Sequence, residues 1–95
     1  MHEPLRLTLT ACQPIEGKTV LNLCCGVGTF SFPLAELGAE QVVGVDASED
    51  LVQKARSAAE QRGLERRCLF ECADVLFYQS PQSYDYVVAL GLLDQ

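Results

Sequence analysis

Two glycines and an aspartate are the residues of this sequence whose types and spacing suggest chemistry. Gly26 and Gly28 follow an apolar run, and Asp46 stands 20 residues after Gly26 at the end of a second apolar run. Glycine allows a sharp turn with positive φ and lets a ligand come close to the backbone. A strand, a glycine turn and a helix start can together bind a nucleotide or another polar ligand. The alternative is an ordinary tight turn without a ligand, because a short glycine pattern is weak by itself.

Asp46 and Asp74 each stand at the end of a predicted strand. In βαβ nucleotide sites an acidic residue at the end of the second strand accepts hydrogen bonds from ribose hydroxyls. The spacing of Asp46 from the glycines therefore predicts ribose binding. Asp74 lies at the carboxyl end of the third strand, which is the edge where ligands bind in open α/β sheets. Either aspartate could instead be a polar strand-end residue without a ligand, and Asp74 could cap its own turn.

The surrounding residues predict strands that alternate with helices. The predicted strands cover residues 20–23, 41–45, 68–72 and 84–90. The first helix covers residues 32–37 and ends at Gly38, and the second follows the N-cap Ser48 and ends at Gly63. This alternation is typical of a doubly wound parallel sheet of the α/β class. We interpret residues 3–13 as a lead-in segment and residues 77–83 as a loop or broken helix.

The composition indicates one small globular domain. The chain has 95 residues, of which 48% are hydrophobic and 21% charged. No apolar run approaches the roughly 20 residues of a membrane span, and the first residues lack a signal-peptide pattern, so we expect a cytoplasmic protein that does not bind membranes. The net charge is −6, and Arg62, Arg66 and Arg67 form the sole basic cluster. This charge argues against a surface that follows nucleic-acid phosphates.

Five cysteines are an odd number, and their spacing does not indicate a disulfide framework. A zinc site with four thiolates can be imagined from Cys24, Cys25, Cys68 and Cys72. Their arrangement lacks the usual pair of cysteines separated by two residues. We therefore expect no metal, and reduced cysteines that pack in the core.

Four strings from Thr19 onward, VLNLCCGVGTF, GVDAS, ADV and YDYVVALGLLD, resemble the S-adenosylmethionine-dependent methyltransferases of the Rossmann-like class. The resemblance implies a three-layer α/β fold with a parallel sheet of strand order 3-2-1-4 for the part present. It implies S-adenosyl-L-methionine as the cofactor. The residues that it assigns to cofactor binding are Asn22, Cys24, Gly26, Gly28, Asp46, Ala47, Asp74 and Val75.

The resemblance also gives these residues roles. The loop of residues 24–28 would lie under the methionine part of the cofactor, and Asp46 would hold the ribose hydroxyls. Asp74 and Val75 would bracket the adenine. The implied reaction is a direct displacement, in which the protein positions the acceptor and the methyl group in line and excludes water.

The sequence departs from the family at two positions. Asn22 stands where the family usually has an acid, so it keeps hydrogen-bonding capacity but loses a charge that could complement an ammonium group. Cys24 stands where the first glycine is usual. The string CCGVGTFSFPLA is similar to the RNA uracil-5 methyltransferases, but residues 90–93 lack their aspartate-proline-proline type of stretch. We therefore expect a methyl acceptor that is an oxygen or nitrogen of a small molecule rather than RNA.

In this family the sheet continues beyond the fourth strand and brings most of the acceptor pocket. We expect residues 1–95 to be a single cofactor-binding domain, an incomplete seven-stranded fold truncated after the fourth strand and inactive by itself. A missing C-terminal half or a partner chain would cover the open edge of that strand. The sequence assigns no catalytic residue. Two alternatives stay open: a nicotinamide- or flavin-binding domain of an oxidoreductase, and a non-catalytic methyltransferase-like binding module.

Overall fold

A computed structural model describes residues 15–76, 78 and 82–89 of the chain. The strands in this part are β1 (Thr19–Leu23), β2 (Gln41–Asp46), β3 (Cys68–Cys72) and β4 (Tyr86–Val88), and the helices are α2 (Ser31–Glu36) and α3 (Glu49–Arg62). The first three strands and both helices match the predicted ranges to within one residue. The predicted lead-in segment, Leu90 and the residues after it lie outside the described residues.

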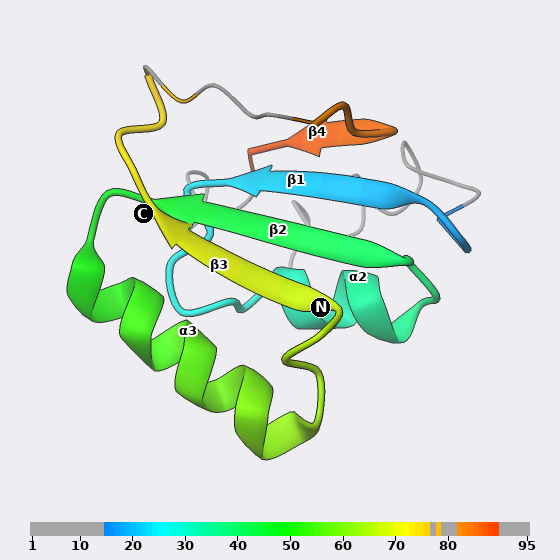
Figure 1. Cartoon of the computed structure of the whole chain (residues 1–95), viewed down its shortest axis with the longest axis horizontal. Coiled ribbons are helices and arrows are strands. Elements are labelled where there is room, and N and C mark those ends of the chain that lie inside the picture. Colours follow the sequence, from blue (N-terminus) through cyan, green and yellow to red (C-terminus); the bar gives the residue numbers. More distant parts are fainter. Residues whose placement is uncertain (1–14, 77, 79–81, 90–95) are drawn as a thin grey trace.

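The strands form one parallel sheet with the order β3-β2-β1-β4, as expected (Figure 1). Leu23 of β1 lies opposite Val45 of β2, and Asp46 lies opposite Cys72 of β3. The carboxyl ends of the strands therefore meet at one edge of the sheet, on the left in Figure 1. Both predicted aspartates belong to this edge.

The predicted bounds of the fourth strand are wrong, because β4 begins at Tyr86 and ends at Val88. Asp85 precedes it and closes onto the start of β1. Its Oδ2 accepts hydrogen bonds from N and Oγ1 of Thr19 over 2.8 and 3.2 Å, and its own N–H donates to the carbonyl of Thr19 over 3.0 Å. The side chain of Asp85 thus caps the end of the ladder, and the strand pairing starts only after it.

Helices α2 and α3 cover the same face of the sheet, below the strands in Figure 1. Their buried side chains pack on Val20 of β1, Val42 of β2 and Phe70 of β3 to form the main core. Small residues such as Ala55 and Ala59 let α3 lie close to the strands. The described residues thus build two of the three expected layers and confirm the parallel α/β class.

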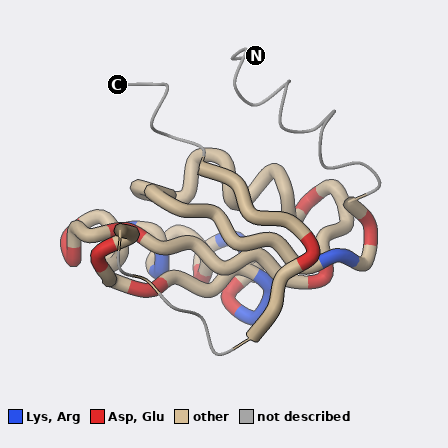
Figure 2. Tube along the Cα trace, turned by 90° about the horizontal axis from the view of Figure 1, so that it is seen from above, with Lys and Arg blue, Asp and Glu red and all other residues tan. Residues whose placement is uncertain are grey.

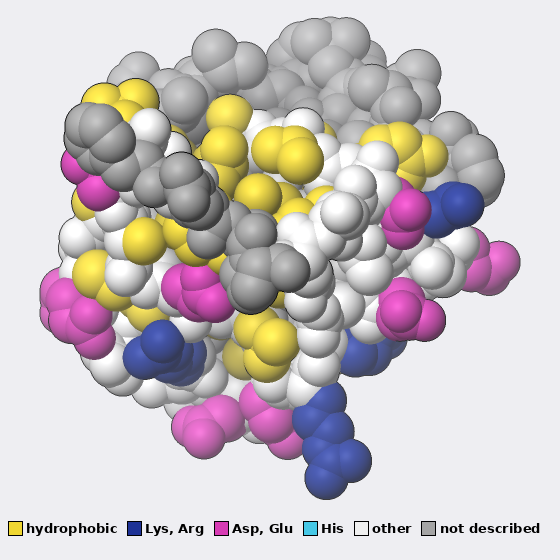
Figure 3. Space-filling model, turned by 45° about the horizontal axis from the view of Figure 1, so that its top comes forward, with side chains coloured by type: hydrophobic (Ala, Val, Ile, Leu, Met, Phe, Trp, Pro, Cys, Tyr) yellow, Lys and Arg dark blue, Asp and Glu magenta, His cyan; other side chains and the backbone are white. Residues whose placement is uncertain are grey.

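The opposite face of the sheet carries a second, smaller group of apolar side chains. The register places Leu69, Val43, Leu21 and Val87 in one row across the strands. The outer two members are exposed, Leu69 by 40% and Val87 by 59%. Figure 3 shows hydrophobic side chains gathered on this face. A third layer of the expected fold would pack here.

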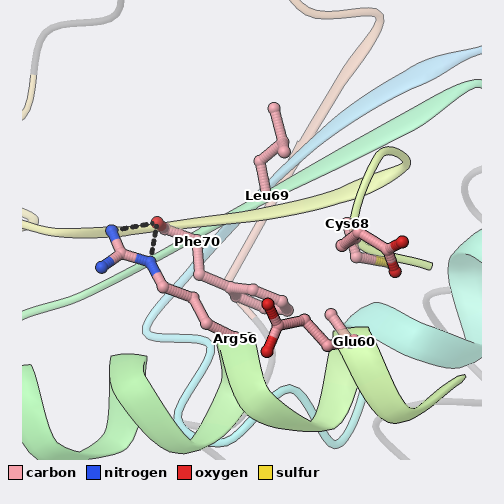
Figure 4. A pocket seen from close by; sticks show the side chains of 7 residues that line it. Arg56, Glu60, Cys68, Leu69 and Phe70 are labelled. Atoms are coloured by element: carbon pink, nitrogen blue, oxygen red, sulfur yellow. Dashed lines mark hydrogen bonds between the residues drawn. The ribbon is translucent and has the colours of Figure 1, made fainter. Parts of the chain in front are cut away.

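Three arginines join the two helices to each other, to β3 and to the segment before β3. Nη2 of Arg67 donates to the carbonyls of Ala35 and Ala39 around the end of α2. The guanidinium of Arg62 lies 4.5 Å from the ring centroid of Phe32. Arg56 reaches from α3 to the outer edge of β3, where its Nε and Nη2 donate to the carbonyl of Phe70, beside a cavity of about 270 Å³ (Figure 4). None of the described helices is long and apolar enough to cross a membrane.

Candidate functional site

The loop between β1 and α2 contains three residues with positive φ in five positions: Cys24 at 59°, Gly26 at 60° and Gly28 at 92°. A Cβ on Gly28 would lie 2.7 Å from Cε2 of Phe32, so packing requires glycine there. A Cβ on Gly26 would meet nothing within 4 Å. Gly28 therefore lets the loop pack on the helix, whereas Gly26 leaves its backbone open to a ligand.

The backbone of Cys24 is in the left-handed region, which costs a residue other than glycine about 1–2 kcal/mol. Such strain persists where the surrounding contacts determine the conformation. The N–H of Cys25 donates to the carbonyl of Val45 over 3.1 Å, and the N–H of Gly28 donates to the carbonyl of Cys25 over 3.1 Å. A Cβ on Gly44 would lie 2.8 Å from Sγ of Cys25. Gly44 thus makes room for Cys25, a role that the sequence did not reveal.

Asp46 links this loop to the next helix. Its Oδ2 accepts a hydrogen bond from the N–H of Gly26 over 2.9 Å, and its Oδ1 accepts one from the N–H of Ser48 over 3.0 Å. A carboxylate offers about four acceptor positions, so both oxygens keep capacity for further donors such as ribose hydroxyls. The structure thus places Asp46 and Gly26 in direct contact, as a shared site requires.

The other predicted residues of this edge lie on the neighbouring strand ends. The N–H of Ala73 donates to the carbonyl of Asp46 over 3.0 Å, which joins the segment after β3 to the end of β2. Asp74 is exposed, and its Oδ1 accepts a hydrogen bond from the N–H of Leu76 over 3.0 Å. Val75 packs with the apolar group around Val45. An acidic and an apolar residue therefore follow directly after the residue that bonds to Asp46.

Ala47 follows Asp46 and is exposed. Its carbonyl accepts a hydrogen bond from the thiol of Cys72 over 3.5 Å. Ala47 therefore belongs to the same strand-end edge as Asp46, and its small side chain leaves that edge accessible.

Asn22 has surroundings unlike those of the other predicted site residues. Its side chain is fully buried, and its Nδ2 donates to Oγ of Ser31 over 3.0 Å. Ser31 is fully buried as well. The sequence did not predict the contact between Ser31 and Asn22, because a serine at a helix start is common and its buried partner is nine residues away.

The cysteines near this site are not activated thiols. Burial, followed by the negative charge of Asp46, raises the pKa of Cys25 to about 12 and the pKa of Cys24 above its usual value. Burial raises the pKa of Cys68 to about 11, and a hydrogen bond with Glu49 raises that of Cys72. The thiolate is the reactive form, so these thiols are poor nucleophiles. Among the described residues, no group of three or more His, Cys, Asp or Glu side chains could hold a metal.

Comparison with known proteins assigns this arrangement to a family. A sequence family described as "Methyltransferase domain" matches residues 20–95. The chain belongs to this family. The cofactor of this family is S-adenosyl-L-methionine, as the resemblance implied. Membership in this methyltransferase family decides against the dinucleotide-binding oxidoreductase.

A solved methyltransferase supports the same conclusion for the fold. The chain is similar to an S-adenosylmethionine-dependent methyltransferase from Thiobacillus denitrificans in complex with S-adenosyl-L-homocysteine, with 25% identity and a TM-score of 0.79. The match covers 96% of this chain and 37% of that protein. The residues of the site fit such a cofactor. Gly26 offers open backbone, Asp46 offers acceptors, and none of the predicted site residues is a Lys or Arg that would serve a pyrophosphate.

Two curated relatives correct the expected acceptor. The chain is 38% identical over 91 residues to "23S rRNA (uracil(1939)-C(5))-methyltransferase RlmD" of Azoarcus sp. (strain BH72), which covers 96% of this chain and 20% of the relative. It is 42% identical over 72 residues to the protein of the same name from Shewanella sp. (strain MR-4), 76% of this chain and 14% of the relative. The chain thus spans a fifth or less of these relatives. The preference for a small-molecule acceptor over RNA is wrong, because it rested on residues 90–93 and gave too little weight to the glycine loop.

Proposed function

We propose that this chain is the cofactor-binding part of an RNA methyltransferase that transfers a methyl group from S-adenosyl-L-methionine to C5 of a uracil in 23S rRNA. The observation that carries the proposal is the 38% identity to an enzyme of that name over 96% of this chain. The glycine loop that resembled the RNA uracil-5 methyltransferases supports it.

In this proposal the residues of the chain bind and orient the cofactor. Asp46 accepts hydrogen bonds from the ribose hydroxyls while its contacts to Gly26 and Ser48 hold it in place. The loop of residues 24–28 supports the methionine part, and Asp74 with Val75 borders the adenine. The cofactor supplies an electrophilic methyl group. Fixing its position relative to the acceptor lowers the barrier by removing translational and rotational freedom in advance.

The RNA itself is held by residues outside the described part of the chain in this proposal. Arg56, Arg62 and Arg67 contact the protein's own carbonyls and an aromatic ring. Figure 2 shows the Lys and Arg positions interspersed with acidic ones. Because phosphate binding depends mainly on basic side chains, this surface is a poor RNA track. We also propose that residues 1–95 belong to one domain whose sheet continues past β4.

A methyl-transfer assay tests the proposal. The full-length protein that contains this chain is purified and incubated with S-adenosyl-L-methionine carrying an isotopically labelled methyl group and with a 23S rRNA fragment. The expected product is 5-methyluridine, detected by mass spectrometry of the digested RNA. A matched fragment in which cytidine replaces the modified uridine is the control and gains no label. Binding of S-adenosyl-L-homocysteine without any transfer to RNA would instead favour the non-catalytic module.

A further inference from the structure

The buried hydrogen bond between Asn22 and Ser31 joins the two elements that flank the glycine loop. Asn22 lies near the end of β1, and Ser31 is the first residue of α2. Neither side chain is exposed to solvent, and the distance between Nδ2 and Oγ is 3.0 Å. A buried polar pair of this kind is costly to break, because each partner left behind loses its hydrogen bond without regaining water.

The conformation of the glycine loop next to this bond depends on contacts from outside the loop. Three of its residues have positive φ, and one of them, Cys24, carries a side chain. Asp46 holds the loop from the open side through the N–H of Gly26. The bond between Asn22 and Ser31 fixes the separation of the two ends from the buried side. The loop is therefore held from both sides, although a ligand can reach only one of them.

We propose that Asn22 and Ser31 form a positioning pair for the cofactor. They act through the glycine loop, by keeping the backbone of residues 24–28 in its binding conformation, and not by contact with the ligand. The inference rests on cofactor binding by this family and is independent of the RNA acceptor. Asn22 has no exposed surface, so an effect on the ligand has to pass through the loop.

Hydrogen exchange measured by NMR tests the effect on the loop. The variants are Asn22→Leu, Ser31→Ala and the double variant. In each of them the amide protons of Gly26 and Gly28 are expected to exchange about tenfold faster than in the wild type, with the amides of α3 as the internal reference. The control is Val52→Ala, which removes buried apolar contacts of α3 and leaves the bond between Asn22 and Ser31 intact. Equal acceleration throughout the chain in the Asn22 and Ser31 variants would overturn the proposal.

Calorimetry with S-adenosyl-L-homocysteine tests the effect on the ligand. Each single variant is expected to bind about tenfold more weakly, and the double variant no more weakly than the worse single one, because both remove the same bond. Val52→Ala is expected to lower the unfolding temperature and keep the wild-type dissociation constant. Wild-type affinity in folded Asn22→Leu and Ser31→Ala would overturn the proposal. A wild-type protein that did not bind would instead contradict the cofactor role of the whole site, while the exchange data would still report on the loop.

Discussion

Each end of β1 has a glycine with positive φ within three residues of the strand and a carboxylate that accepts hydrogen bonds from backbone N–H groups. At the amino end these are Gly17, with φ of 74°, and Asp85. At the carboxyl end they are Gly26, with φ of 60°, and Asp46. A Cβ on either glycine would meet nothing within 4 Å.

The two carboxylates differ in how many segments they join. Asp85 receives both of its donors from Thr19, so it closes one contact between two strands. Asp46 receives its donors from Gly26 and Ser48, which belong to the segments on either side of α2 and β2. The difference teaches that a capping carboxylate alone makes a clamp. A site arises where the carboxylate also organises a loop whose backbone is open.

Removing each carboxylate tests most directly whether the two ends of β1 differ in ligand binding. Asp46→Ala is expected to weaken S-adenosyl-L-homocysteine binding by about a hundredfold, because charge-assisted hydrogen bonds are lost and the N–H of Gly26 loses its partner. Asp85→Ala is the matched control and is expected to lower the unfolding temperature without changing affinity. Both quantities follow from calorimetry. Similar affinities of the two variants would remove the distinction between the ends.

Alanine at each glycine gives the next largest effect. Gly26→Ala and Gly17→Ala each force a side chain into the left-handed region, so both are expected to lose about 1 kcal/mol of unfolding free energy in urea titrations. Only Gly26→Ala places a methyl group on the surface that faces the ligand, and it is expected to weaken binding about tenfold in addition. If Gly17→Ala weakened binding as much, strain and not access would explain the loss.

A substitution of Asp74 tests whether a second aspartate at the carboxyl edge contributes to binding as much as Asp46 does. Asp74→Asn keeps an oxygen that can accept from the N–H of Leu76 but removes the charge. We expect binding about threefold weaker, since Asp74 is exposed and water competes for its hydrogen bonds. Glu71→Gln, an exposed acid on the same strand, is the control and leaves the dissociation constant unchanged. A hundredfold loss in Asp74→Asn would make it the equal of Asp46.

A substitution at the amino end of β1 is expected to change the pH dependence of the unfolding temperature and not the affinity for S-adenosyl-L-homocysteine. Hydrogen bonds from Thr19 hold the pKa of Asp85 below its ordinary value of 3.8. The charged form therefore stabilises the fold at pH values above that, and this contribution is lost as the pH falls through the lowered pKa. The difference in unfolding temperature between wild type and Asp85→Asn is expected to be constant near neutral pH and to shrink as the pH falls below 3.8 and through the lowered pKa. Glu40→Gln, near the same end, is the control, and a difference that grew in acid would contradict the assignment.

Local signals in the sequence were enough for α3 and for the spacing of Asp46. Ser48 accepts a hydrogen bond from the N–H of Leu51 over 3.2 Å, and Gly63 has a left-handed φ of 71°, so the chain encodes both ends of that helix within a few residues. The glycines and Asp46 meet because a parallel βαβ unit brings the ends of its strands together. The strand order followed from the resemblance.

Features that depend on distant partners could not be predicted in this way. The limits of β4 depend on Asp85 closing onto Thr19, 66 residues away. The burial of Asn22 depends on Ser31, and the use of Arg62 and Arg67 depends on where α2 packs. The predicted contacts of the site residues with the cofactor remain predictions. The methyl acceptor stays a proposal as well.

The hydrogen bonds that hold the glycine loop also couple its conformation to the pairing of two strands. The N–H of Cys25 and the N–H of Gly26 both bond to groups of β2, namely the carbonyl of Val45 and the side chain of Asp46. These two bonds of the loop therefore exist only while β1 and β2 are paired. A ligand that binds only the completed loop adds RT ln(1 + [L]/Kd) to the unfolding free energy. A cofactor bound to this loop would therefore raise the free energy of unfolding, and it would dissociate when these two strands separate.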